Sequence, residues 1–142
     1  MSTIPRNLNW VKALSECSVA SVFSALHRGA EEDVADANEM RAAQFPGYPV
    51  QKFAVTANSA GNVFSVFEEG NAATAIRFHR ESERVLIRAS EREYAVTLTL
   101  NDAGECKLRI DGGGEQLEPW QVRRRVLEAL LFAPTMPSTP RM

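Results

Sequence analysis

The 142-residue sequence contains two cysteines and two histidines, so it has little of the chemistry that metal sites and disulfide frameworks require. Cys17 and Cys106 lie far apart and form no C-x-x-C motif, and His27 and His79 share no metal-ligand spacing with each other or with a cysteine. We therefore expect no metal site and no cofactor. Both cysteines are predicted to be small apolar core residues in a reducing compartment.

Long apolar runs are also absent. No run approaches the roughly 18 residues needed to cross a bilayer, and the N-terminal region lacks the apolar block of a secretory leader. A membrane-spanning protein is therefore excluded, and the cytoplasm is the expected location. The formal net charge of −2 provides no overall attraction to nucleic acid or to anionic lipid, so binding of either would need a local patch.

Catalytic motifs are missing as well. The sequence has no G-x-S-x-G nucleophile elbow, and the three glycines at 112–114 lack the G-K-[ST] that completes a phosphate loop. The acidic residues at 31–33 diverge by about 100° per position on a helix and cannot converge on one substrate atom. We therefore predict no catalytic residue and a protein that is not an enzyme.

What the sequence does contain begins with a helical pattern over residues 18–43. Its apolar side chains recur every three or four positions and form one stripe, with the acidic residues largely outside it. Gly29 interrupts the pattern at a cost of about 1 kcal/mol relative to alanine. The second half, from Ala30, is lined mostly by alanine, which favours close packing against another helix or a second copy of the chain.

Six short segments then alternate apolar and polar residues, as β-strands do. They are residues 50–57, 62–68, 73–79, 84–89, 93–100 and 105–110, and short turns join them. Links of this length favour antiparallel hairpins, so the sequence predicts an antiparallel meander of about six strands. Segment 62–68 has apolar residues on both sides, which predicts a helix on each face of the sheet there.

A last helical pattern covers residues 119–132, and its wide apolar arc predicts two packing partners. Residues 133–142 contain three prolines and no periodicity, which predicts a disordered tail. The predicted fold class is therefore α+β. A single domain over residues 1–132 has a long N-terminal helix, the antiparallel meander, and a C-terminal helix packed on the sheet.

Several basic side chains form a hypothetical anion-binding patch, namely Arg77, His79, Arg88, Lys107, Arg109 and Arg123. The first five occupy outward strand positions, where they could bind a phosphate or carboxylate or could form an ordinary solvated face. Arg123 points into the apolar arc of the last helix, so it either pairs with a nearby carboxylate or captures an anionic ligand. Nucleic-acid binding by the basic face is the weakest hypothesis, because the face lacks aromatic residues on which bases stack.

Two other functions fit the sequence better. The first is a non-catalytic interaction module that forms a homodimer or binds a protein partner, because its helices carry more apolar surface than one sheet contact requires. The second is a small-molecule or lipid carrier, with an apolar pocket between a curved sheet and the C-terminal helix. The residues predicted to line such a pocket or interface are Phe53, Phe64, Phe78, Tyr94, Leu98 and Trp120.

Overall fold

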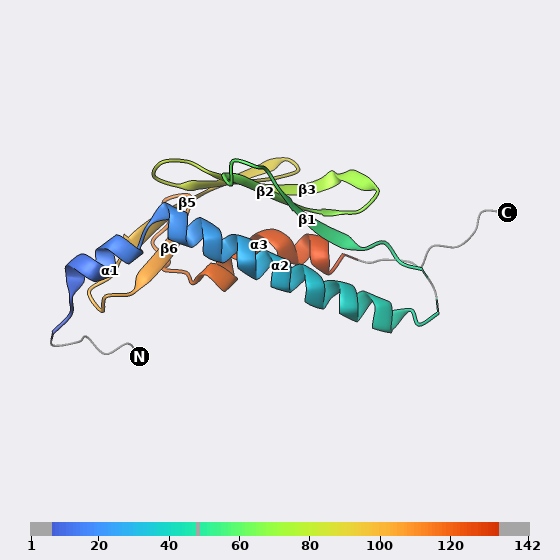
Figure 1. Cartoon of the computed structure of the whole chain (residues 1–142), viewed down its shortest axis with the longest axis horizontal. Coiled ribbons are helices and arrows are strands. Elements are labelled where there is room, and N and C mark those ends of the chain that lie inside the picture. The colour runs from blue at the N-terminus through green and yellow to red at the C-terminus, as the bar shows by residue number, and fades with distance from the viewer. Residues whose placement is uncertain (1–6, 48, 134–142) are drawn as a thin grey trace.

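The computed structural model describes residues 7–47 and 49–133, which form a helical layer beneath an antiparallel sheet (Figure 1). The helices are α1 (Trp10–Glu16), α2 (Val19–Gln44) and α3 (Pro119–Leu131). The strands are β1 (Phe53–Ala57), β2 (Val63–Glu68), β3 (Asn71–Arg80), β4 (Val85–Ala89), β5 (Arg92–Leu100) and β6 (Cys106–Ile110). The α+β prediction is confirmed. The predicted disordered tail falls, apart from Ala133, outside the described residues.

The start and end of α2 follow from local chemistry. The side chain of Ser18 accepts a hydrogen bond from the Ser21 backbone N–H at 3.1 Å and so caps the first turn. Pro46 and Gly47 follow the last turn, and Gly47 has a φ of +83°, which does not continue a helix. The 26-residue helix therefore runs almost where the apolar periodicity predicts.

The six strands pair in sequence order, each antiparallel to the next. One face of the sheet is apolar because inward positions line up across the strands, as in the pairs Phe64↔Phe78 and Phe78↔Ile87. The rings of Phe64 and Phe78 stack with centroids 4.3 Å apart, and neither side chain is exposed. The core therefore lies between this face and the helices.

Both long helices cover the same face of the sheet, so the prediction of a helix on each face at residues 62–68 is wrong (Figure 1). On the open face of β2, Val63 lies opposite His79 and Phe67 lies opposite Ala54. These neighbours leave Val63 and Phe67 half-buried without a second helical layer.

Polar side chains of α2 fasten it to the edge strand β1. Asn38 donates to the Phe53 carbonyl at 3.0 Å and accepts from the Phe53 backbone N–H at 2.7 Å, so its amide satisfies both groups at that point of the sheet edge. Arg41 is 5% exposed, donates to the Gln51 carbonyl at 2.8 Å and pairs with Glu68 at 2.9 Å. The apolar stripe alone did not predict this polar anchoring.

A disulfide joins Cys17, at the joint between α1 and α2, to Cys106 at the start of β6. The Cα atoms lie 5.3 Å apart although the residues are separated by 89 positions. The prediction of two free core cysteines is therefore wrong, because sequence distance says nothing about where the helical layer crosses the last strand. Disulfides persist in oxidising environments, so the cysteines do not support the expected cytoplasmic location.

Candidate functional site

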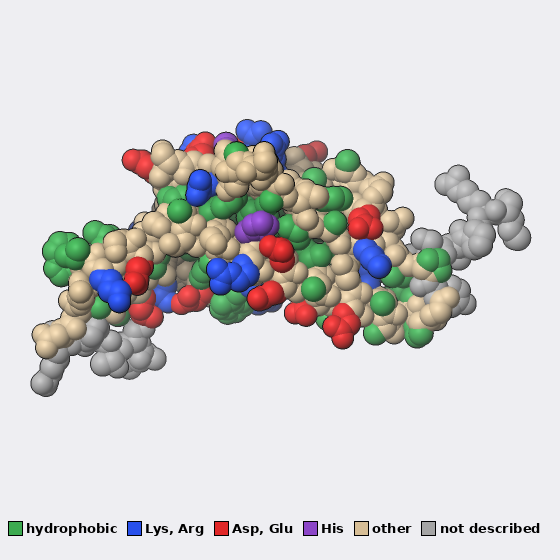
Figure 2. All heavy atoms as spheres, in the orientation of Figure 1, with side chains coloured by type: hydrophobic (Ala, Val, Ile, Leu, Met, Phe, Trp, Pro, Cys, Tyr) green, Lys and Arg blue, Asp and Glu red, His purple; other side chains and the backbone are tan. Residues whose placement is uncertain are grey.

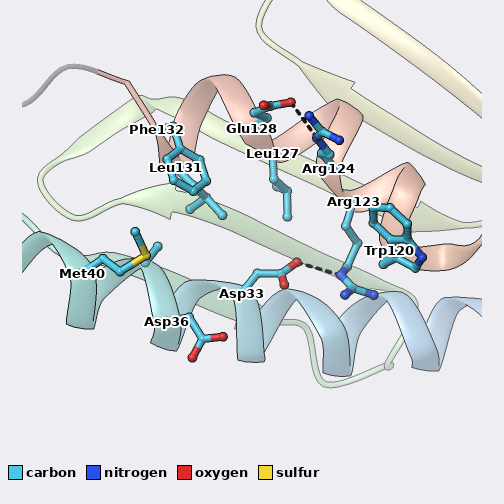
Figure 3. A pocket seen from close by; sticks show the side chains of 11 residues that line it. Asp33, Asp36, Met40, Trp120, Arg123, Arg124, Leu127, Glu128, Leu131 and Phe132 are labelled. Atoms are coloured by element: carbon cyan, nitrogen blue, oxygen red, sulfur yellow. Dashed lines mark hydrogen bonds and ion pairs between the residues drawn. The ribbon is translucent and has the colours of Figure 1, made fainter.

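A groove with a volume of about 370 Å³ runs between α2 and α3 (Figure 3). Its floor and rim are largely apolar. Two charged pairs, Asp33–Arg123 and Glu128–Arg124, lie along it. The lining side chains come from Asp33, Asp36, Ala37, Met40, Trp120, Arg123, Arg124, Leu127, Glu128, Leu131 and Phe132.

The α2 wall consists of residues spaced three or four apart, which share one side of the helix. Ala37 is buried, and its short side chain leaves room above it, whereas Met40 is 50% exposed at the rim. Phe23, Ala30 and Val34 face the core instead. The second half of α2 thus packs on the sheet with one stripe and presents a neighbouring stripe to the groove.

The α3 wall is set by a helix start that the local sequence specifies. Pro119 occupies the first turn, and Glu118 and Gln121 form a capping box. Val122 and Val126 are buried, and Leu127 is almost fully buried at the groove floor. The helix therefore contacts both the sheet and α2, which confirms the prediction of two packing partners.

The rim carries large apolar side chains that remain open to solvent. Trp120 is 53% exposed and Phe132 is 65% exposed. In Figure 3, Trp120 lies beside Arg123 near one end, while Phe132, Leu131 and Met40 lie near the other. A second hollow of about 310 Å³ continues from this end along the last turns of α2 and shares Met40 and Phe132 with the groove. The concave apolar surface therefore extends beyond the groove itself.

An ion pair holds the Trp120 end of the groove together. Arg123 Nε lies 2.7 Å from Asp33 Oδ2, with the two side chains 15% and 33% exposed. This pairing was one of the two alternatives for Arg123 and is confirmed. Gly29 makes room for it, because a Cβ atom at that position would lie 2.2 Å from Arg123 Nη1. The glycine that interrupts the helical stripe is therefore the point where α2 admits a side chain from α3.

The two walls differ in charge. Along α2, Glu32, Asp36 and Glu39 are exposed and have no ion-pair partner in the described part of the chain. Figure 2 shows acidic side chains spread over the path of this helix. On α3, Arg124 pairs with Glu128 at 3.3 Å and Arg125 pairs with Glu115 at 2.7 Å, and all four side chains are largely exposed. Of these residues, Asp36, Arg124 and Glu128 line the groove. The α2 side therefore contributes one carboxylate without an ion-pair partner among the described residues, whereas Arg124 on the α3 side is already paired with Glu128.

The structure divides the predicted anion-binding patch. Arg77, His79 and Arg88 lie together on the open sheet face, where they line a cleft of about 360 Å³ with Glu81 and Leu86. Arg123 lies on the other side of the sheet, in the α2–α3 layer.

The remaining two residues, Lys107 and Arg109, are on β6. Lys107 forms ion pairs with Glu118 and Glu105, and the hydrogen bond to Glu118 raises the pKa of the lysine. Arg109 lies opposite Thr97, and its Nε is buried without a hydrogen-bond partner. Neither is among the residues that line the cleft.

The six residues predicted to line a pocket or interface lie in different environments. Phe64 and Phe78 are fully buried, and Phe53 lies beneath the guanidinium of Arg41 at 4.1 Å, so these rings are core. Tyr94 and Leu98 are half-buried against the same core. Of the six, Trp120 lines the groove. The carrier hypothesis therefore loses the three phenylalanine rings that it placed against a ligand.

Sequence reasoning missed the groove itself. It assigned Asp33 and Asp36 to a solvated surface, placed Leu131 in the apolar arc of the last helix, and gave Phe132 no role beyond the end of that helix. One signal was available on each helix. On α2 the positions 33, 36, 37 and 40 form a stripe that is rotated from the core-facing stripe. On α3 the positions 120, 123, 127 and 131 form a similar second stripe. Neither pattern indicates by itself that the two stripes face one another.

Comparisons with known protein families, with curated proteins and with solved structures found no match for the chain. Within residues 7–47 and 49–133, no group of three or more His, Cys, Asp and Glu side chains is placed to hold a metal ion. No helix in these ranges is both long and apolar enough to cross a membrane.

Proposed function

We propose that the chain is a non-catalytic interaction module that forms a homodimer through the α2–α3 groove. The observation that carries this proposal is the exposed apolar rim of Met40, Trp120 and Phe132 around a floor that includes Leu127. Aromatic side chains beside a concave apolar surface are typical anchors of protein interfaces, because they lose much solvent contact when a partner covers them.

A second copy is the occupant that the charges favour. In a two-fold dimer the same patch occurs on both subunits, so the α2 wall of one copy can lie over the α3 wall of its partner. This arrangement would bring the carboxylate of Asp36 towards the guanidinium of Arg124, both of which line the groove. Opposite charges across the rim would then orient the two copies while the apolar residues provide most of the binding energy.

The contribution of the rim can be estimated from Phe132. Burying its exposed ring surface would contribute about 1.5 kcal/mol to the free energy of dimerisation. A two-fold dimer buries one such ring from each subunit, so the two rings together contribute about 3 kcal/mol. A Phe132→Glu substitution should therefore weaken dimerisation by roughly 100-fold or more, because it also places a charge in the interface.

The matched control is Trp10→Glu. Trp10 is 62% exposed on α1, close to the 65% of Phe132, but α1 lies at the opposite end of the molecule from the C-terminal end of α3 (Figure 1). The oligomeric state would be measured by size-exclusion chromatography with light scattering and by sedimentation velocity over a range of concentrations. We expect a dimer for the wild type and the Trp10→Glu variant, and a monomer for Phe132→Glu.

Two results would contradict the proposal. The first is a wild-type chain that stays monomeric at tens of micromolar, roughly the concentration at which a stable dimer should persist. This result would exclude homodimerisation. A dimer that Trp10→Glu dissociates and Phe132→Glu leaves intact assigns the interface to α1 instead of the groove.

A further inference from the structure

We propose that the open face of the sheet binds the phosphate group of a small ligand between Arg77 and Arg88. This site lies on the face of the sheet that α2 and α3 leave uncovered, so it is independent of the α2–α3 groove (Figure 1). Figure 2 shows Lys and Arg side chains gathered beside a histidine on this sheet side of the molecule.

The arginine pair is the first observation. Arg77 and Arg88 are directly opposite one another on β3 and β4, and both are exposed. Like charges placed opposite each other in a sheet are destabilising by themselves. The side chain of Arg77 has no hydrogen-bond or ion-pair partner among the described residues. Two adjacent guanidinium groups of this kind present a fork of donors that suits the oxygens of a phosphate.

A carboxylate on the neighbouring strand β5 competes for this pair. Glu93 lies opposite Arg88 on β5 and accepts from Arg88 Nε at 2.7 Å. Since a guanidinium has five N–H donors, the donors on the terminal nitrogens of Arg88 remain for a ligand. Glu93 therefore orients one arginine without neutralising the pair.

The cleft beside the arginines is the second observation. His79 and Leu86 lie opposite each other on β3 and β4, two positions along from the arginine pair, and help to line a hollow of about 360 Å³. A volume of this size suits a small molecule. Leu86 provides apolar surface beside the arginines for the organic part of a ligand, and His79 adds a ring nitrogen that can donate to a phosphate oxygen.

Glu81, which also lines the cleft, already has an ion-pair partner. Glu81 accepts from Arg84 Nε at 2.6 Å, and this hydrogen bond raises the pKa of Arg84. Its negative charge is thus compensated by a neighbour outside the cleft, which leaves the Arg77 end positive. A phosphate would bind at that end and direct its organic group over Leu86.

A nucleic-acid strand fits this site less well than a single phosphate. Strand-binding surfaces combine several phosphate contacts with aromatic rings on which bases stack. Among the described residues that line the cleft there is no Phe, Tyr or Trp. Two arginines and a histidine are enough for one phosphate group but not for a track of them.

The test is a titration followed by ¹H–¹⁵N NMR. The full chain is titrated with inorganic phosphate, with phenyl phosphate and, at matched ionic strength, with chloride and benzoate. We expect saturable shifts of the backbone amides at Arg77, His79, Leu86 and Arg88 with both phosphates and with neither control anion. Tighter binding of phenyl phosphate than of inorganic phosphate would indicate that the ligand is a phosphate ester whose organic group contacts the apolar part of the cleft. Equal binding of the two would indicate that the ligand is free phosphate.

Three variants and a control sharpen the result. Arg77→Gln and Arg88→Gln should each weaken phosphate binding by about fivefold to tenfold, because each removes one charged hydrogen-bonding group from an exposed site. Glu93→Gln should tighten binding, since it removes a negative charge beside Arg88. Arg125→Gln changes an exposed arginine on α3 that pairs with Glu115, and it should leave binding unchanged.

The proposal is overturned if wild-type amides at the cleft do not shift on adding phosphate, or if benzoate and chloride shift them equally. It is also overturned if Arg77→Gln titrates like Arg125→Gln while keeping the dispersed spectrum of a folded chain. Glu93→Gln guards against a trivial loss of fold, because its expected effect is a gain of binding.

Discussion

Replacing Gly29 with alanine should destabilise the protein, although the same change normally stabilises a helix. Alanine in a helix interior is favoured over glycine by about 1 kcal/mol. At this position, however, the three nearest heavy atoms to a Cβ would all belong to the Arg123 guanidinium, at 2.2–2.6 Å. The guanidinium would have to leave, and its ion pair with Asp33 would break.

The size of the effect follows from the burial of that pair. A charge-assisted hydrogen bond contributes about 1.5–3 kcal/mol, and the 33% exposure of Asp33 places this one near 2 kcal/mol. Subtracting the helical gain of about 1 kcal/mol leaves a net destabilisation of about 1 kcal/mol for Gly29→Ala. In an Arg123→Ala background the pair is already lost, so the same substitution should stabilise by about 1 kcal/mol.

The assay is a double-mutant cycle with four proteins, each unfolded in urea with its disulfide intact. The expected coupling free energy between the two positions is about 2 kcal/mol, with the sign of the Gly29→Ala effect reversed by Arg123→Ala. Arg124→Ala provides the matched control, since Arg124 is the next residue on α3, its side chain is 65% exposed, and its ion pair with Glu128 at 3.3 Å does not involve α2. Gly29→Ala should remain destabilising in that background.

Two outcomes would contradict the proposed role of Gly29 in making room for Arg123. Stabilisation of about 1 kcal/mol in both the wild-type and Arg123→Ala backgrounds would mean that the guanidinium does not pack against Gly29. Equal destabilisation in both would mean that α2 requires glycine for its backbone and not for the space that Arg123 occupies.

Two further predictions concern β6. Replacing Cys17 and Cys106 with alanine should lower the free energy of unfolding by about 4–5 kcal/mol, because the disulfide closes a loop of 89 residues in the unfolded chain. If the variant has the same urea midpoint as the oxidised wild type, the disulfide is not formed. The hydrogen bond to Glu118 raises the pKa of Lys107 above 10.5, so the stability it contributes is present below that pH and is lost as the pH rises through the higher folded-state value. The stability difference between wild type and Lys107→Gln should therefore shrink as the pH is raised above 10.5 in thermal unfolding, and a difference that grows would contradict this sign.

The candidate groove illustrates why a site can escape sequence reasoning even when every element is predicted. The apolar arc of α3 indicated a second packing partner, and the alanines of α2 indicated a close neighbour. The patterns did not indicate that α2 and α3 are each other's neighbour. An apolar stripe predicts that a helix face is covered, but it does not predict which element covers it. Met40 was predicted only as part of the apolar stripe of the long helix and Phe132 only as the end of the last helix, and neither was predicted to line a groove.

Local sequence patterns were sufficient to predict the long helices, the strands and the order of the strands in the sheet. Helical and strand periodicities reflect backbone geometry within a few residues, and short turns permit only antiparallel neighbours, so these features need no long-range information. Which distant side chains meet could be seen only once the helices and the sheet were placed in space. Cys17 reaches Cys106, Arg123 passes over Gly29 to Asp33, and the predicted basic patch separates into a cleft on the open face and pairs elsewhere. The reason is that such contacts depend on where layers cross in space, and residues that are far apart along a chain carry no local signal of that crossing.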